Sequence, residues 1–356
     1  MRFSQGSARD DVYRVSNRYE AATWNVAAIN NNPFEYWVTY PEDAYNEFMQ
    51  GVEDILHDNT QDVVVHSIFT DVMFSELVQD MRNCNIENLD LLSNIWETDY
   101  KWRYAINGYL KDRSLGEKRL ASMPDRITNT INCKDCSVIR RPTVINAYNG
   151  GSLHSPSAWW EKWRKFMFDT YVEVFSRDNR DATPQLVCNL ITPILRTKYP
   201  AITAHEQEMS VALQILCLAI LDAIFVHIVN HVAPLEWETI RSTLSHALIH
   251  GKDDRICSIL AQSYADCDVV FIQEASAALV RKLAQHPELG NKYALLMPAD
   301  FDGKRDQNSV ILAACRRFQS ATCVDVTPQV FAGRRRRRNA HRARPNPHPR
   351  PRGRRS

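Results

Sequence analysis

Hydrophobic positions along the chain follow two different periods. Residues 19–26 contain a short apolar run of strand length and similar runs return after Cys257, whereas the long region between them repeats apolar residues every three to four positions. The first pattern is typical of a buried β-strand and the second of an amphipathic helix. We therefore predict one early strand, a mostly helical middle, and then a strand, a helix and two more strands in DVVFIQ, ASAALVRKLAQHPELG, KYALLMP and NSVILAAC.

The helical middle begins after Pro41, where the apolar residues of EDAYNEFMQGVEDILHD fall on one stripe. A second helix is predicted over Gln61 to Arg82, and a third begins at Ser155, which can cap it, and Pro156, which suits the first helical position. The third helix carries an aromatic stripe that is typical of a core-facing side, although it could also hold a base or a lipid: Trp160, Trp163, Met167, Tyr171 and Val174.

The most apolar segment runs from Val211 to Val229 and is just long enough to span a membrane as a helix. Gln214, Asp222 and His227 would each be costly in hydrocarbon. We therefore predict a buried helix here and no membrane span.

Two residue pairs have the spacing of metal ligands. His227 and His231 lie four positions apart, and Cys133 and Cys136 form a lone C-x-x-C. Neither pair has a companion motif, which favours structural roles over metal or redox chemistry.

The segment from Met123 to Gly151 is rich in turn-forming residues and predicts a long ordered loop or a pair of loops. Asp125, Arg126 and Asn129 are candidates for a binding surface within it.

The charge of the chain is unevenly distributed. The last 24 residues, from Gly333, hold 11 Arg and no acid, which leaves 32 Lys and Arg against 42 Asp and Glu in the rest, a formal charge of −10. Such a Pro/Arg-rich tail cannot bury apolar surface and is expected to be disordered. It could bind nucleic acid through Arg334 to Arg355 or act as a nuclear-targeting signal, or it could be the product of a GC-rich gene read out of frame.

The amino-acid composition indicates which class of protein the chain belongs to and in which compartment it is expected. The chain has 44% hydrophobic residues and only 11 glycines, which favours a packed globular protein. Its first 20 residues lack the apolar region of a secretory signal, and its nine cysteines form no framework of closely spaced pairs. We expect an intracellular protein, cytoplasmic or nuclear.

Three of the strand segments carry a resemblance to a known family. TWNVAAIN with Asn25, DVVFIQEA with Gln273 and Glu274, and KRDQNSVIL together resemble the N-terminal half of the endonuclease/exonuclease/phosphatase superfamily, which contains metal-dependent phosphoesterases. The resemblance implies an α+β sandwich, incomplete in this chain, with a large and mainly α-helical inserted domain. The expected segments are the first strand in 1–38, the helical insertion in 39–256, the remaining α/β elements in 257–332 and the tail in 333–356.

The resemblance also implies a site. Glu274 would bind the catalytic Mg²⁺, or Mn²⁺ in its place, and Asn25 would orient phosphate beside it as a catalytic residue, with Asn308 as a substrate contact. Mg²⁺ keeps most of its waters and needs only one or two protein carboxylates, so a single Glu can anchor it. The alternatives from the residues alone are that Asn25 caps a turn and that Glu274 is a first-turn acid of the following helix.

The chain departs from the family after Glu274. The only later D-x-N spacing, Asp306 to Asn308, precedes a strand that should not carry the catalytic motif, and no Asp-His dipeptide follows. We expect a protein that resembles a Mg²⁺-dependent phosphoester hydrolase of unknown substrate class but is catalytically incomplete. The alternative is a non-catalytic interaction protein with a basic tail.

Overall fold

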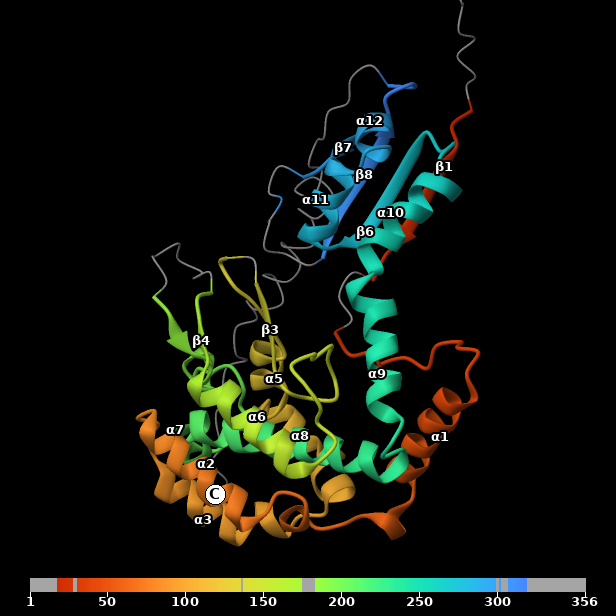
Figure 1. Cartoon of the computed structure of the whole chain (residues 1–356). Helices are drawn as coiled ribbons and strands as arrows, with labels where there is room; N and C mark the ends of the chain where they lie inside the picture. The colour runs from red at the N-terminus through yellow and green to blue at the C-terminus, as the bar shows by residue number, and fades with distance from the viewer. Residues whose placement is uncertain are drawn as a thin grey trace, which may run out of the picture. The chain divides into compact units, whose positions relative to one another are not determined.

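The computed structural model describes residues 18–27, 31–135, 137–174, 183–298, 301 and 307–318. The chain divides into two compact units, one formed by residues 1–29 and 253–356 and the other by residues 30–252 (Figure 1). We call them the sheet unit and the helical unit. The Arg-rich tail and its predicted contact with nucleic acid lie outside the described residues.

The sheet unit is built on one four-stranded sheet with the order β1-β6-β8-β7 (Figure 1). The first two strands in this order are parallel, and the other neighbouring pairs are antiparallel. The strands coincide with the four predicted from the sequence: β1 (Ala21–Asn25), β6 (Val269–Ala275), β7 (Tyr293–Leu296) and β8 (Asn308–Ala314). A second sheet facing this one is not among the described strands, so the sandwich remains a prediction.

The two faces of the sheet differ in polarity. On β6, Val270 and Ile272 point to one face and pack against helices α10 (Lys252–Ser263) and α11 (Ala277–Gln285). The side chain between them, Phe271, belongs to the opposite face and is 41% exposed. A short helix, α12 (Leu289–Lys292), leads into β7. The apolar core of this unit therefore lies on the helix-covered face.

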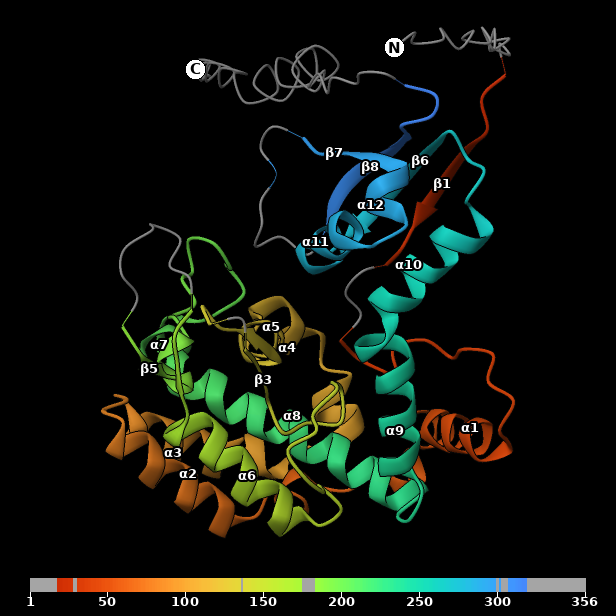
Figure 2. The same cartoon turned by 45° about the horizontal axis from the view of Figure 1, so that its top comes forward.

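The helical unit surrounds one long apolar helix, α8 (Ser210–Val232) (Figure 2). Its other α-helices are α1 (Asp43–His57), α2 (Asp71–Asn83), α3 (Leu89–Thr98), α4 (Arg113–Lys118), α5 (Ser122–Thr128), α6 (Pro156–Asp169), α7 (Ala204–Glu208) and α9 (Trp237–Ser245). Helices α1, α3, α5, α6 and α7 contact α8. The mainly helical middle of the chain is as predicted.

Short elements connect these helices. The 3₁₀ turns are η1 (Asn59–Gln61), η2 (Val65–Ser67), η3 (Tyr100–Trp102) and η5 (Val187–Leu190), and the π-helical segments are η4 (Ala105–Leu110) and η6 (His246–His250). Two small antiparallel pairs complete the unit: β2 (Thr130–Asn132) with β3 (Val138–Arg140), and β4 (Tyr171–Val172) with β5 (Gln185–Leu186).

By length and composition, α8 is the one described helix that could cross a membrane, but 78% of its most apolar window is buried inside the structure. The predicted buried helix is therefore observed, and the absence of a membrane span remains a prediction.

Asp222 lies at the centre of this apolar helix and is fully buried. Its carboxylate accepts hydrogen bonds from Arg141 Nε at 2.7 Å, Thr143 Oγ1 at 2.6 Å and Trp163 Nε1 at 2.8 Å. Arg141, also fully buried, donates as well to Asp125 at 2.6 Å. A buried charge persists only when it is paired and hydrogen-bonded, and this network meets that condition.

Two predicted helices differ from those observed. The helix predicted over 61–82 begins only at Asp71, because Thr70 caps it by accepting a hydrogen bond from Met73 N at 3.3 Å. The third predicted helix does begin at the Ser155 cap, but it ends at Asp169. Tyr171 therefore lies outside the buried aromatic stripe, pairs with Leu186 in a short strand and is 64% exposed.

The stretch 123–151 is a loop only in part, because residues 141–151 are irregular but regular elements precede them. It contains most of α5, the β2–β3 pair, and residues that build the buried network. Asp125 pairs with Arg141, and Asn129 accepts through its backbone carbonyl from Asn146 Nδ2 at 2.8 Å. These two candidates for a binding surface thus stabilise the core. Cys133 is buried, and Cys136 lies outside the described residues, so the C-x-x-C is not described as a pair.

Candidate functional site

The three residues predicted to form a site meet at one edge of the sheet. Asn25 is the last residue of β1 and is in register with Gln273 of the parallel strand β6. Glu274 follows directly, and Asn308 begins the antiparallel strand β8 opposite Ala275. Because β8 runs in the opposite direction, its first residue lies at the same edge as the last residues of β1 and β6. We call Asn25, Glu274 and Asn308 the strand-end site.

Glu274 has an unusual backbone conformation. The register of β6 with β8 shifts between Ile272 and Ala275, which marks a β-bulge, and Glu274 within it has φ of +57°. A side chain in this left-handed region costs about 1–2 kcal/mol relative to the right-handed one. Bulges and strained residues occur preferentially where a side chain is aimed at a functional site.

Most polar side chains at this edge of the sheet already form hydrogen bonds, and one of them does not. Gln273 Nε2 donates to Thr23 Oγ1 at 3.1 Å, and the buried Asn308 donates to Ala275 O at 3.2 Å. Asn25 Oδ1 accepts from Ala27 N at 2.9 Å, so it does cap a local turn. The half-buried Glu274 carboxylate forms no hydrogen bond or ion pair with any described residue.

The alternative role for Glu274 is wrong. Helix α11 begins at Ala277, and its cap is Ser276, which accepts from Leu279 N at 2.9 Å. Glu274 therefore lies two residues before the cap rather than in the first helical turn, and it does not serve the helix dipole in the expected way.

The strand-end site could hold a metal ion only through few protein ligands. The described residues contain no group of three or more His, Cys, Asp or Glu side chains poised to bind one metal. Mg²⁺, however, is commonly bound by one or two carboxylates with waters and phosphate oxygens completing its shell. The Glu274 carboxylate, which has no partner among the described residues and lies at the same edge of the sheet as Asn25, fits this mode.

The strain at Glu274 can be tested with two variants that both remove its carboxylate. We expect Glu274→Gly to be more stable than Glu274→Ala by about 1 kcal/mol, because only glycine adopts this backbone conformation without penalty. Urea unfolding of both proteins measures the difference. Equal stability would show that position 274 is not strained.

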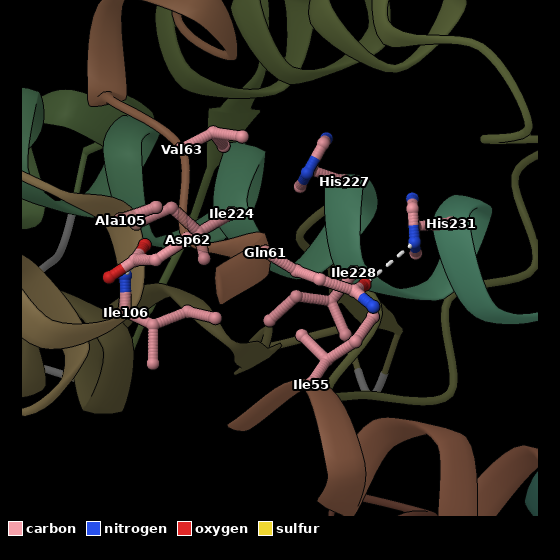
Figure 3. Close-up of a pocket in the computed structure, with 10 residues that line it drawn as sticks. All are labelled: Ile55, Gln61, Asp62, Val63, Ala105, Ile106, Ile224, His227, Ile228 and His231. Carbon is pink, nitrogen blue, oxygen red and sulfur yellow. Dashed lines mark hydrogen bonds between the residues drawn. The ribbon is translucent and has the colours of Figure 1, made fainter. Parts of the chain in front are cut away.

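A second candidate is a pocket of about 90 Å³ in the helical unit (Figure 3). It is lined by Ile55, Gln61, Asp62, Val63, Ala105, Ile106, Ile224, His227, Ile228 and His231. His231 Nε2 lies 3.1 Å from Gln61 Oε1. The Asp62 carboxylate accepts from Ile106 N at 2.8 Å and Asn107 N at 2.9 Å, so it caps η4.

Among the described residues, the two histidines of this pocket do not belong to a group of three or more metal-ligating side chains. Their ring centroids lie 6.2 Å apart, and burial lowers the pKa of His227, which the neighbouring His231 lowers further. With Asp62 committed to the backbone and most of the lining apolar, the pocket shows no reactive arrangement. The strand-end site is therefore the better candidate.

These observations define an α+β protein with a small mixed sheet in one unit and a helical core in another. The chain belongs to the family described as Domain of unknown function (DUF8234), whose model matches residues 62–242. No curated protein and no solved structure shows a match to the chain. The matched region falls within the helical unit, and Asn25, Glu274 and Asn308 all lie outside it.

Proposed function

We propose that the strand-end site binds Mg²⁺, or Mn²⁺ in its place, together with a phosphoester, in the manner of a metal-dependent phosphoester hydrolase. The observation that carries this proposal is the Glu274 carboxylate, half-buried, without a partner among the described residues and held in a strained bulge beside Asn25. The resemblance of the three strand segments to the endonuclease/exonuclease/phosphatase superfamily supports it.

Each residue of the site has a separate role in this proposal. Glu274 would hold the metal through its carboxylate. Asn25 has its side-chain oxygen occupied by Ala27 N, which leaves its NH₂ group as the donor for a phosphate oxygen. Asn308 keeps its predicted role as a substrate contact, and its amide also donates to Ala275 O, which ties the start of β8 to the bulge.

The metal would supply charge neutralisation at the phosphoryl oxygens when bound. The chain would contribute a carboxylate on a constrained backbone, which holds the metal, and an amide donor at the same edge, which orients a phosphate oxygen. No residue is assigned as a general base, so the proposal covers binding of metal and phosphoester and leaves turnover to experiment.

The test uses Mn²⁺ as the probe and the full chain as the protein. We expect electron paramagnetic resonance to detect one Mn²⁺ site that Glu274→Ala weakens on the order of ten-fold or more, because the sole anchoring carboxylate is lost. Metal-dependent cleavage of bis(4-nitrophenyl) phosphate, if present in the unaltered protein, should disappear in the same variant.

The matched control is Glu288→Ala. Glu288 is an exposed carboxylate beside α12, which leads into Tyr293 at the opposite end of the sheet. This variant should bind Mn²⁺ like the unaltered protein. Equal Mn²⁺ binding by the Glu274→Ala variant would overturn the proposal.

A further inference from the structure

Two cysteines that are distant in the sequence share one pocket of the helical unit. Cys84 and Cys188 both line a pocket of about 450 Å³. Cys84 is the C-terminal cap of α2, and Cys188 belongs to η5. Their spacing along the chain gives no indication of a pair, because only the fold brings the two segments together.

The C-terminal end of α6 holds both cysteines in place. Cys84 Sγ donates a weak hydrogen bond to Phe168 O at 4.0 Å. Val187, the residue before Cys188, donates through its backbone N–H to Thr170 O at 3.1 Å. The two acceptors are backbone carbonyls at the end of the same helix. Cys84 and Cys188 are therefore both positioned against this helix end.

The two thiols also affect each other's ionisation. Burial raises the pKa of Cys84, and a hydrogen bond with the Cys188 side chain acts against this rise. Burial and the nearby Cys84 thiol raise the pKa of Cys188 to about 12. Cys188 is 1% exposed, whereas Cys84 is half-buried. A reagent in the pocket would therefore meet Cys84 first, with Cys188 beside it.

The pocket has an acidic lining. Glu87 and Glu208 are exposed carboxylates of this lining, which contains no Lys, Arg or His among the described residues. Asp80 and Asp169 also act on Cys84, since both raise the pKa of its thiol. The charges around the pocket therefore favour a cation over an anion.

We propose that Cys84 and Cys188 form a reversible disulfide bond when a small cationic disulfide enters this pocket. Cys84 Sγ attacks one sulfur of the small disulfide, whose S–S bond breaks, so that a mixed disulfide forms and one thiol is released. Cys188 Sγ then attacks Cys84 Sγ and releases the second thiol. Each leaving thiolate takes up the proton that the attacking cysteine loses. The two protein thiols are oxidised to one disulfide, and one small disulfide is reduced to two thiols.

This site is independent of the strand-end site. Both cysteines belong to the helical unit and lie in the region that the family model matches, and the reaction needs no metal ion. Disulfide formation should therefore proceed unchanged in the Glu274→Ala variant. Its failure and the failure of the proposed function are distinguishable.

The experiment treats the fully reduced full chain with cystamine, the disulfide of 2-aminoethanethiol. Remaining thiols are alkylated, and the modified cysteines are located by peptide mass spectrometry. In the unaltered protein we expect a peptide pair cross-linked through Cys84 and Cys188, which a reductant separates. It should form over hours rather than seconds, because the raised pKa values leave few thiolates.

Two variants separate the steps of the reaction. The Cys188→Ala variant should keep the aminothiol on Cys84 as a mixed disulfide, because the second attacking thiol is absent. The Cys84→Ser variant should leave the buried Cys188 unmodified. The matched control is Cys267→Ser, because Cys267 is also half-buried but lies in the sheet unit. This control should form the Cys84–Cys188 disulfide like the unaltered protein.

The charge of the reagent provides a further measurement. Glutathione disulfide, which is negatively charged, should react on the order of ten-fold more slowly than cystamine at low salt, and Glu208→Gln should reduce this difference. Equal rates would overturn the preference for a cationic disulfide. The proposal as a whole is overturned if cystamine leaves a lasting mixed disulfide on Cys84 of the unaltered protein, or if neither cysteine reacts in the folded protein.

Discussion

Replacing Asp222 with alanine is expected to lower the free energy of unfolding of the helical unit by about 3–5 kcal/mol. The carboxylate accepts four hydrogen bonds, two of them from Arg141, and both side chains are fully buried. Its removal leaves the Arg141 guanidinium with Asp125 and Thr128 as its remaining partners. It also leaves Thr143 and Trp163 without their acceptor.

Tryptophan fluorescence during urea unfolding measures this loss. Of the eight Trp in the chain, all except Trp24 lie in residues 30–252, so the signal reports mainly on the helical unit. The control is Glu161→Ala, an exposed acid on α6, which should change stability by less than about 0.5 kcal/mol.

A double variant distinguishes the net contribution of the Arg141–Asp222 ion pair to the free energy of unfolding from the loss caused by removing only one partner. Replacing Arg141 with Met and Asp222 with Leu together removes both charges and keeps apolar volume. We expect this protein to be more stable than the Asp222→Ala variant, because no unpaired charge remains fully buried. Asp125 loses its Arg141 partner in the double variant, but its side chain is 26% exposed. If Asp222→Ala alone proves nearly neutral, the network does not stabilise the helical unit.

The strands and their shared edge could be predicted because they depend on local patterns. Continuous apolar runs of strand length mark β6 and β8, and polar residues at their ends mark the edge. The pairing of β1 with β6 joins residues about 250 positions apart, yet it follows once both runs are interpreted as buried neighbouring strands.

The polar interior of the helical unit could not be predicted in this way. Arg141 and Asp222 are 81 positions apart, and each by itself is unfavourable in a core. The charge of Asp222 argues against a membrane span, but no residue near it in the sequence identifies Arg141 as its partner. Only the packing of the segment after β3 against α8 brings the charges together.

The error at the start of the second predicted helix comes from contacts with residues distant in the sequence. Apolar spacing continues through residues 61–70, but the Asp62 side chain binds backbone N–H groups of η4, and Val64 forms a β-bridge with Tyr104. These long-range contacts hold the segment out of the helix that begins at Asp71. The strain of Glu274 was equally hidden, because a bulge is a property of strand register rather than of the residue itself.

Replacing Ile272 with alanine should destabilise the sheet unit by about 2–5 kcal/mol, the range for large-to-small changes in a core. Ile272 is fully buried on β6, a strand with neighbours on both sides, and belongs to a hydrophobic cluster made entirely of residues of this unit. Phe271→Ala, one residue earlier on the opposite and partly exposed face, should cost less despite removing a larger side chain.

Hydrogen exchange of peptides from β6 and from α8 measures both variants. The Ile272→Ala variant should exchange faster in β6 while protection of α8 stays unchanged, because α8 belongs to the other hydrophobic cluster. Equal losses in both peptides would mean that the two clusters unfold together. A larger loss of β6 protection in Phe271→Ala than in Ile272→Ala would contradict the assignment of Ile272 to the buried face of the sheet. It would also contradict the conclusion that the sheet carrying the strand-end site is stabilised by packing on one face.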